Sequence, residues 1–450
     1  MNARPRFLAL LAFLMGASLT LGSDWPRFLG PDGTGVSSET GLLELFPSTG
    51  PEKLWSKSVG TGYSAPSVMG KQLVLHHRQG SEEIVQSFDA VTGEEAWRHS
   101  SPVSYVDPYG YNNGPRCTPL LTPEFCYTYG VEGRLLCLER SSGKLVWERS
   151  TSKDFEVPPA FFGIGSTPIL EGDKLIVMVG GQTNAGMVAF DARTGKTVWQ
   201  SVGQKNWDGL SMVGWPGEPV IHWQNWEKQA SYASPVAATL HGARHILCLM
   251  RQGLVSVNPT NGAVNFSFWF RSRANDSVNA MSPIVQDDLI LISGAYYRVG
   301  SVLLRVKPDG HAVEEVWRST SLEIHWMTPI LREGFVYAFS GRNEPDARFR
   351  CIELKTGFLK WDRDESWSPH SSEQPPVFGR GSLILADGKL IALGEGGMLG
   401  LFKPNPEKLE ELCRFQVPEL GHPTWAAPVL ANKRLYLRNE HRLICYSLAR

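Results

Sequence analysis

The chain has 450 residues, 42% of them hydrophobic, so it is long enough to bury a large core. Its 44 lysine and arginine residues nearly balance its 45 aspartate and glutamate residues, and no basic stripe is present, which argues against nucleic acid as a partner. With 15 Trp, 45 Gly and 30 Pro and no helical apolar periodicity, the composition favours many short strands joined by tight turns. We therefore expect an all-β protein.

The first 23 residues have the pattern of a Sec-type signal peptide. Arg4 and Arg6 precede a short apolar run, and small residues follow up to Ser23. We expect cleavage near Gly22 or Ser23 and a periplasmic or secreted mature chain; the alternative is a buried N-terminal strand. No later stretch has the roughly 20 uninterrupted apolar residues of a transmembrane segment. Residues 24–50 then form an N-terminal arm ahead of the first repeat.

A segment of about 50 residues repeats along the chain, a period typical of propellers and repeat arrays. In each copy an alternating strand reaches a Thr-Gly or Asn-Gly turn, and a second strand then ends in a large aromatic residue. The terminal aromatic residues are Trp97, Trp147, Trp199, Trp317 and Trp361, with weaker copies that end at Phe268 and Phe415. Their fixed place in the repeat predicts packing between neighbouring blades.

A second signal precedes each of these hairpins: a small polar residue, then proline, then an apolar run. It occurs at Pro66, Pro119, Pro168, Pro235, Pro283, Pro329 and Pro428, with Leu383 in the remaining slot. The last copy lacks its fourth strand, and residues 51–59 supply a matching strand with Trp55 in the aromatic slot. We predict an eight-bladed β-propeller of four-stranded antiparallel blades, closed by this N-terminal strand, as one domain over residues 51–450.

The repeat pattern xxxDxxTGxxxW with its S/TxP strands, together with WPRFLGPDGTGV and NGPRCTPLL, resembles the pyrroloquinoline quinone (PQQ)-type repeat of quinoprotein alcohol dehydrogenase-like propellers. The resemblance covers residues 24–450 and implies PQQ with Ca²⁺ at the channel mouth and an Asp as catalytic base. The chain departs from that pattern, because it has no adjacent cysteines, no CxxCH haem motif and no assignable set of metal ligands.

The resemblance extends to the eight-bladed lipoproteins that assist outer-membrane protein assembly, which bind partner proteins and use no quinone. This chain has no lipid-attachment cysteine after the signal segment. Because one fold hosts unrelated functions, we expect a non-catalytic, monomeric binding or scaffold module without a cofactor. Its partner would be a protein or a small ligand. The alternative is a PQQ- and Ca-dependent dehydrogenase of alcohols or sugars.

The other signals favour structural roles. The seven cysteines form no adjacent pair and no CxxC motif, and four lie in apolar strand patterns, so buried free thiols are expected. His76 and His77 fall in a strand, where they point to opposite faces and suit a surface or strand-end position. The acidic residues of 362–367 are expected to be solvated. The insertion 200–231 contains tryptophans outside any repeat slot, which could cover the mouth or meet a partner: Trp207, Trp215, Trp223 and Trp226.

Strand direction predicts where a ligand would sit. Long connections between blades gather on one face, and each innermost strand starts there, so the residue three before the repeat proline should lie near the channel mouth. These residues are Tyr63, Arg116, Gly165, Tyr232, Ala280, Trp326, Arg380 and Trp425, and the slot before them adds Asn279 and His325. We hypothesise that Arg116, Arg380, Trp326 and Trp425 recognise an anionic or aromatic group. The alternatives are a channel plug, or an arginine that pairs with a loop carboxylate such as Glu373.

Overall fold

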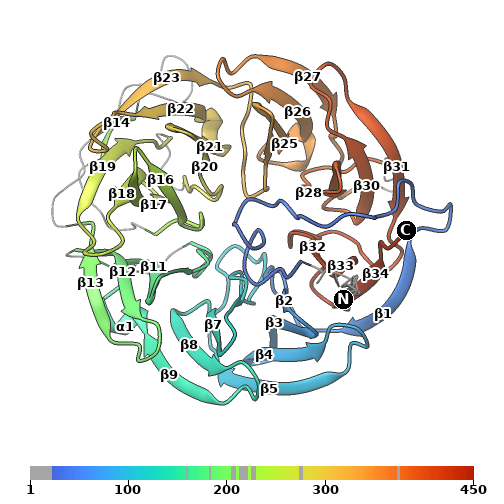
Figure 1. The fold of residues 1–450 in the computed structure, drawn as a ribbon, viewed down its shortest axis with the longest axis horizontal. Helices are drawn as coiled ribbons and strands as arrows, with labels where there is room; N and C mark the ends of the chain where they lie inside the picture. Colours follow the sequence, from blue (N-terminus) through green and yellow to red (C-terminus); the bar gives the residue numbers. More distant parts are fainter. Residues whose placement is uncertain are drawn as a thin grey trace, which may run out of the picture.

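The computed structural model describes residues 23–158, 161–181, 184–203, 209–211, 221–223, 230–272, 277–371 and 375–450. Within them, eight four-stranded antiparallel sheets surround a central channel (Figure 1). This arrangement confirms the predicted eight-bladed propeller. No helix in the described part of the chain has the length and apolar character that crossing a bilayer requires. The predicted signal peptide, apart from Ser23, lies outside the described residues.

The blades follow the chain, and each runs from the channel outward. The first four contain β2 (Ser67–Met69), β3 (Gln72–Gln79), β4 (Glu82–Asp89) and β5 (Glu95–Pro102); β6 (Leu120–Leu121), β7 (Phe125–Tyr129), β8 (Arg134–Glu139) and β9 (Leu145–Ser150); β10 (Ile169–Glu171), β11 (Lys174–Gly181), β12 (Ala185–Asp191) and β13 (Thr197–Ser201); β16 (Val236–Leu240), β17 (Ala243–Leu249), β18 (Gly253–Val257) and β19 (Val264–Trp269).

The next three blades contain β20 (Ile284–Gln286), β21 (Leu289–Gly294), β22 (Gly300–Val306) and β23 (Val313–Ser319); β24 (Ile330–Arg332), β25 (Phe335–Ser340), β26 (Arg348–Glu353) and β27 (Leu359–Asp364); β28 (Ser382–Ala386), β29 (Lys389–Leu393), β30 (Met398–Lys403) and β31 (Glu410–Gln416). Outside the blades lie the short helices α1 (Thr151–Asp154), η1 (Tyr296–Arg298) and η2 (Glu344–Asp346), and a hairpin of β14 (Gly209–Ser211) and β15 (Ile221–Trp223).

The eighth blade is assembled from both parts of the chain. It contains β32 (Val429–Ala431), β33 (Arg434–Arg438), β34 (Arg442–Ser447) and, outermost, β1 (Glu52–Ser58). β1 pairs antiparallel with β34, and Trp55 lies opposite Cys445. The predicted closure by the N-terminal strand is therefore confirmed, and it leaves no open sheet edge between the first and last blades.

The repeat tryptophans join each blade to the next one. The indole Nε1 of Trp97 donates a hydrogen bond to the carbonyl oxygen of Arg140 (2.9 Å), one blade further along the chain. The turn glycine of that next blade, Gly143, lies against the same ring with φ 71°, and a Cβ there would come within 2.4 Å of the indole. Only glycine fits this turn and this contact. The predicted packing role of the tryptophans is confirmed.

In two blades, the position that packs against the next blade lies two residues before the predicted aromatic residue. The strand register places Phe266 opposite Ser256 and Cys413 opposite Leu401, the places that tryptophans hold in other blades. The predicted aromatic slots Phe268 and Phe415 were therefore wrong. A β-bulge follows the turn in these strands, and the spacing of four residues from Gly262 to Phe266 is the spacing that leads from Gly93 to Trp97.

In the first five blades, the residues before the repeat prolines form a row of hydrogen bonds along the channel, here called the girdle. The backbone N–H of Ala65 donates to Thr118 Oγ1 (3.2 Å), and that of Thr118 donates to Thr167 Oγ1 (3.2 Å). The series continues from Thr167 N to Ser234 Oγ (2.9 Å) and from Ser234 N to Ser282 Oγ (3.2 Å). The small polar residue of the repeat therefore satisfies a buried amide of the preceding blade.

Residues 24–50 cross the channel before the chain reaches β1 at the rim (Figure 1, dark blue). They lie at the end of the channel opposite the predicted mouth. Trp25 exchanges backbone hydrogen bonds of 2.9 Å with Val68 in the first blade, and the segment later bridges Leu385 in the seventh. Phe28 projects into the channel between these attachments, where it lines a cavity. The N-terminal arm thus lies across the channel and is held by its main chain.

Two further expectations need correction, and one is confirmed. His76 and His77 are not at the surface: they are 2% and 0% exposed in β3, because neighbouring blades cover both faces of that strand. Glu365, in the acidic segment expected to be solvated, is 1% exposed and accepts a hydrogen bond from the backbone of Phe378 (2.7 Å). Cys137, Cys248, Cys351 and Cys445, the four cysteines of the apolar strand patterns, are free and buried, as expected.

Candidate functional site

A cavity of about 350 Å³ lies at the mouth of the channel. All eight residues that lie three positions before the repeat proline line this cavity, each just before an innermost strand: Tyr63, Arg116, Gly165, Tyr232, Ala280, Trp326, Arg380 and Trp425. His325 also lines the cavity. Asn279 lies behind the lining, 2% exposed, where its amide donates to the carbonyl oxygen of Met250 (2.8 Å). Ligand binding by this set stays a prediction.

The wall of the cavity is largely aromatic. The ring centroids of Trp326 and Trp425 lie 5.7 Å apart, and those of Tyr63 and Trp425 lie 5.0 Å apart. Tyr111 and Phe162, from the connections on either side of the second blade, continue this surface outward with a centroid distance of 5.9 Å. Such a wall suits a flat, apolar ring, which would bury its faces against the indoles and phenols.

The floor of the cavity combines one apolar side chain with a set of hydroxyl groups. Phe28 of the N-terminal arm lines the cavity, and Thr118, Thr167 and Ser234 of the girdle surround it. These three hydroxyl oxygens accept backbone amides, but none of them donates a hydrogen bond to a described residue. Their protons are therefore available to an acceptor atom on a bound molecule.

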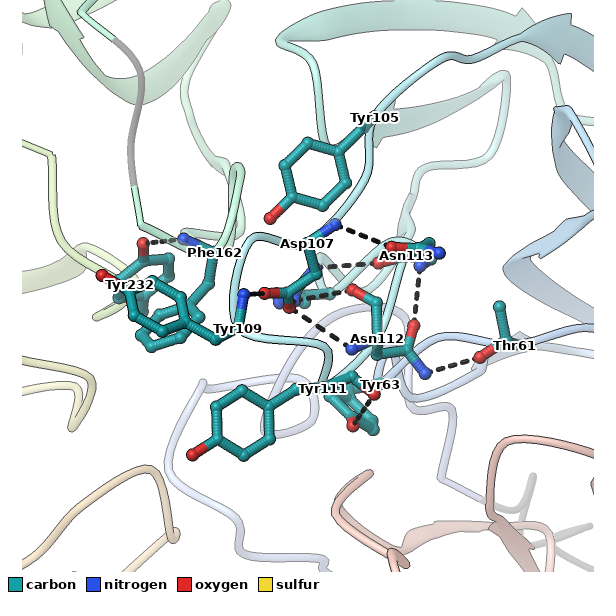
Figure 2. A network of polar contacts seen from close by, with 12 residues as sticks. Thr61, Tyr63, Tyr105, Asp107, Tyr109, Tyr111, Asn112, Asn113, Phe162 and Tyr232 are labelled. Carbon is teal, nitrogen blue, oxygen red and sulfur yellow. Dashed lines mark hydrogen bonds and ion pairs between the residues drawn. The ribbon is translucent and has the colours of Figure 1, made fainter.

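An ordered loop overhangs the mouth on the side of the first and second blades (Figure 2). Asp107 is its centre: its carboxylate pairs with Arg116 (2.9 Å) and accepts the backbone N–H of Tyr109 (2.9 Å). Asn112 ties the loop back to the ring by donating to Thr61 Oγ1 (2.5 Å). Because this network fixes the backbone, Tyr109 and Tyr111 are held at the loop tip although they are 52% and 57% exposed.

A second ionic group lies across the mouth. The guanidinium of Arg380 binds the fully buried carboxylate of Glu395 (2.8 Å) and also binds Glu344. The indole N–H groups of Trp425 (3.1 Å) and Trp367 (2.9 Å) donate to the same Glu395 carboxylate. Burial opposes ionisation of Glu395, but the charge and hydrogen bonds of Arg380 outweigh it and lower the pKa of the carboxyl.

Recognition of an anionic ligand group by Arg116 and Arg380 stays a prediction, and both guanidinium groups have carboxylate partners within the protein. Both side chains are already neutralised, by Asp107 and by Glu395 with Glu344. Pairing with a carboxylate was the alternative left open by the sequence, but its suggested partner, Glu373, lies outside the described residues. Trp207, Trp215 and Trp226 of the insertion are also outside them, whereas Trp223 ends β15.

The slot analysis missed the groups that the loops bring to the mouth. They are Asp107, Tyr111, Phe162, Tyr296, Arg342, Glu344 and Glu395. All seven belong to connections between blades or to loops between the second and third strands of a blade. Strand direction places both kinds of loop on the mouth face, so the sequence carries a signal for these residues, but the prediction used the innermost strands alone.

The residues at the mouth do not fit a Ca²⁺ ion with a bound quinone. Glu344, Glu395 and His422 offer ligand atoms within 4.8 Å of one another. The Arg380 guanidinium, however, hydrogen-bonds to both carboxylates and takes the position that a cation would need. A polycarboxylate quinone would also need several unpaired cations, whereas two of the three arginines that line the cavity, Arg116 and Arg380, are already paired.

Several known proteins are similar to this chain. Quinohemoprotein alcohol dehydrogenase ADH IIB of Pseudomonas putida is 30% identical over 124 residues, which cover 26% of this chain and 17% of that protein. Among solved structures, quinohemoprotein alcohol dehydrogenase from Comamonas testosteroni superimposes with a TM-score of 0.61 at 14% identity, covering 95% of this chain and 80% of its own. BamB from Moraxella catarrhalis superimposes with a TM-score of 0.56 at 13% identity, covering 88% and 99%.

These structural similarities establish the fold and divide between named dehydrogenases and a named assembly factor. The family evidence is broader. A family profile described as outer membrane protein assembly factor BamB matches residues 81–363, well over half of the chain. The chain therefore belongs to this family of PQQ-like β-propellers.

Proposed function

We propose that this protein is an exported, non-catalytic binding module that takes up an aromatic group at its channel mouth. The observation that carries the proposal is the cavity itself: about 350 Å³, walled by Trp326, Trp425 and Tyr63, with Phe28 at its floor. Arg380 between the two carboxylates supports a role without a metal-held quinone. The signal-peptide pattern supports a periplasmic or secreted location.

The loop tip supports a protein as the carrier of that aromatic group. Val106, Tyr109 and Tyr111 are 69%, 52% and 57% exposed, and they adjoin the mouth on a loop fixed by the Asp107 network. Rigid exposed tyrosines bury large areas at little entropic cost when a partner docks. We propose that a partner would contact this tip while one of its side chains, or a small ligand, enters the cavity.

The test uses a neutral flat probe, methyl 2-naphthoate, titrated by calorimetry and by quenching of tryptophan fluorescence. We expect saturable binding that the double variant Trp326→Ala, Trp425→Ala weakens at least about tenfold, because two stacking surfaces are lost. The matched control is Phe358→Ala, which removes an aromatic ring that is 71% exposed and outside the cavity lining. Absence of binding, or equal binding by the double variant, would contradict the proposal.

A further inference from the structure

Three arginines line the mouth cavity, and they differ in what they already bind. Arg116 and Arg380 are held in ion pairs. The side chain of Arg342, in the loop between β25 and β26, forms no ion pair and no hydrogen bond with any described residue. Its guanidinium instead lies over two rings, 4.5 Å from the centroid of Tyr296 and 4.7 Å from that of Tyr297.

Arg342 contacts the two rings through the face of its guanidinium, so its N–H groups form no hydrogen bond with the described residues. A guanidinium held by its face keeps its in-plane N–H groups directed outward, which is the geometry that a carboxylate accepts in a bidentate pair. The two tyrosine rings fix the plane of the group before any ligand arrives, so little side-chain entropy is lost on binding. Arg342 is half-buried at the mouth, where an anionic group at the outer edge of a ligand would reach it.

The remaining charges limit the ligand to one negative group. Around the cavity, the three arginines face four carboxylates, Asp107, Glu344, Glu395 and Glu440. Burial, followed by the charges of Arg380 and Arg342, lowers the pKa of His325 to about 3, so its imidazole is neutral at pH 7. A second negative group on the ligand would meet no unpaired cation among the described lining residues, and Glu344 and Glu395 would repel it.

We propose that Arg342 determines charge selectivity at this site and that the ligand is a flat aromatic group with a single carboxylate. The carboxylate binds the edge of Arg342 at the mouth, and the ring lies against Trp326 and Trp425. Any acceptor on its inner edge meets the free hydroxyl protons of Thr118, Thr167 and Ser234. This inference rests on the proposed binding function and goes beyond it by naming the ligand class and the residue that selects it.

The test compares three probes of the same ring: 2-naphthoate, its neutral methyl ester, and the dianion 2,6-naphthalenedicarboxylate. We expect the full-length mature chain to bind 2-naphthoate at least about tenfold more tightly than the ester, as for a charge-assisted pair, and the dianion more weakly than the monoanion. Arg342→Gln should abolish this preference and leave the affinity for the ester within about twofold. Arg342→Lys, which keeps the charge without the fork, should restore only part of it.

The control is Arg305→Gln, which removes an arginine that is 46% exposed, paired with Asp288 and absent from the cavity lining. It should leave all three affinities unchanged. Equal binding of naphthoate and ester, or an equal loss of both in Arg342→Gln, would overturn the inference while leaving the proposed function intact. If the ester does not bind to the unaltered chain at all, the proposed function fails, and the inference fails with it.

Discussion

The two ends of the channel are formed by different kinds of structure. At one end, the arm of residues 24–50 lies across the ring and is held by backbone hydrogen bonds to the first and seventh blades. At the other end, side chains shape the mouth: the Asp107 network, the Arg380 and Glu395 group, and a series of aromatic rings. The main chain therefore covers one end, whereas individual side chains form the surface of the other end. Because recognition depends on side chains, the mouth is the end that suits ligand binding.

Removal of the closing strand should have the largest effect, because both ends depend on an intact ring. Deletion of residues 52–60 removes β1, exposes the edge of β34 and takes Trp55, 8% exposed, out of the core. We expect a loss of at least about 5 kcal/mol in unfolding free energy, since burial of a tryptophan alone contributes roughly 3–5 kcal/mol. Thermal unfolding measures this. An unchanged melting temperature would show that the closure does not stabilise the ring.

The next largest effect is expected at the mouth. Glu395→Gln leaves the buried Arg380 guanidinium without its main counter-charge and should cost about 3–5 kcal/mol in chemical denaturation. The matched comparison is Lys53→Ala, which breaks the Lys53–Glu419 pair of 2.7 Å, with side chains 50% and 26% exposed. That change should cost less than about 1 kcal/mol. Similar costs for the two variants would contradict a structural role for the buried mouth pair.

A pH-dependent difference is expected from Glu83, between the first two blades. Burial raises the pKa of its carboxyl from 4.5 to about 7, although the backbone N–H of Val131 donates to it (2.9 Å) and opposes the rise. The folded state therefore favours the protonated acid, and this contribution is lost as pH rises from about 4.5 through 7. Relative to the unaltered chain, Glu83→Gln should gain up to about 3 kcal/mol in stability between pH 5 and pH 8.

Denaturation of both proteins at several pH values tests this prediction. Burial, the first cause in each case, also lowers the pKa of His76 to about 3 and of His77 to about 4, so these groups destabilise the fold as pH falls below about 6.5. His76 Nε2 lies 3.8 Å from the Glu83 carboxylate, but both imidazoles are neutral in the folded protein between pH 5 and pH 8, so the contribution of the two histidines cancels in the difference over this range. A difference that does not change with pH would mean that Glu83 titrates normally in the folded protein.

The smallest effect is expected at the arm end. Phe28→Ala removes a half-buried ring from the cavity floor, and it should cost roughly 1–2 kcal/mol because the ring is not fully enclosed. The backbone attachments of the arm remain, so the arm should stay in place. Calorimetric unfolding gives the cost. A loss as large as that of Glu395→Gln would mean that side-chain packing, and not the main chain, holds this end closed.

The predictable parts of this structure are those that the repeat determines. The turn glycines and the prolines indicate the direction of each strand. From strand direction alone, eight residues were predicted near the mouth, and all eight, among them Tyr63 and Trp425, line the cavity. The loops were not predictable in this way, because their shape comes from contacts between distant residues, such as Asn112 with Thr61. The pairing of Arg380 with Glu395 and the stacking of Arg342 likewise depend on loop paths that no period encodes.

The misassigned aromatic slots have a related cause. The same β-bulge follows the turn in the tryptophan blades, and side chains two residues apart in a strand share a face, so alternation alone does not separate Phe268 from Phe266 or Phe415 from Cys413. The path of the N-terminal arm could not be predicted either, because it has no repeat from which a position could be inferred. Residues 24–50 contain no repeat at all, and their position is defined by the strands that they meet, among them Val68 and Leu385.

The tryptophan joints bear on how such a ring could grow in evolution. In six places an indole N–H reaches the backbone of the following blade, as Trp97 reaches Arg140 and Trp361 reaches Asn405. The first, second, third and sixth blades each offer this donor to the following blade and a matching carbonyl to the preceding one. A tandem duplication of one of these blades in the gene would therefore insert a module whose two new joints are chemically complete. The number of blades is then limited by the strand β1, which must still reach its place beside β34.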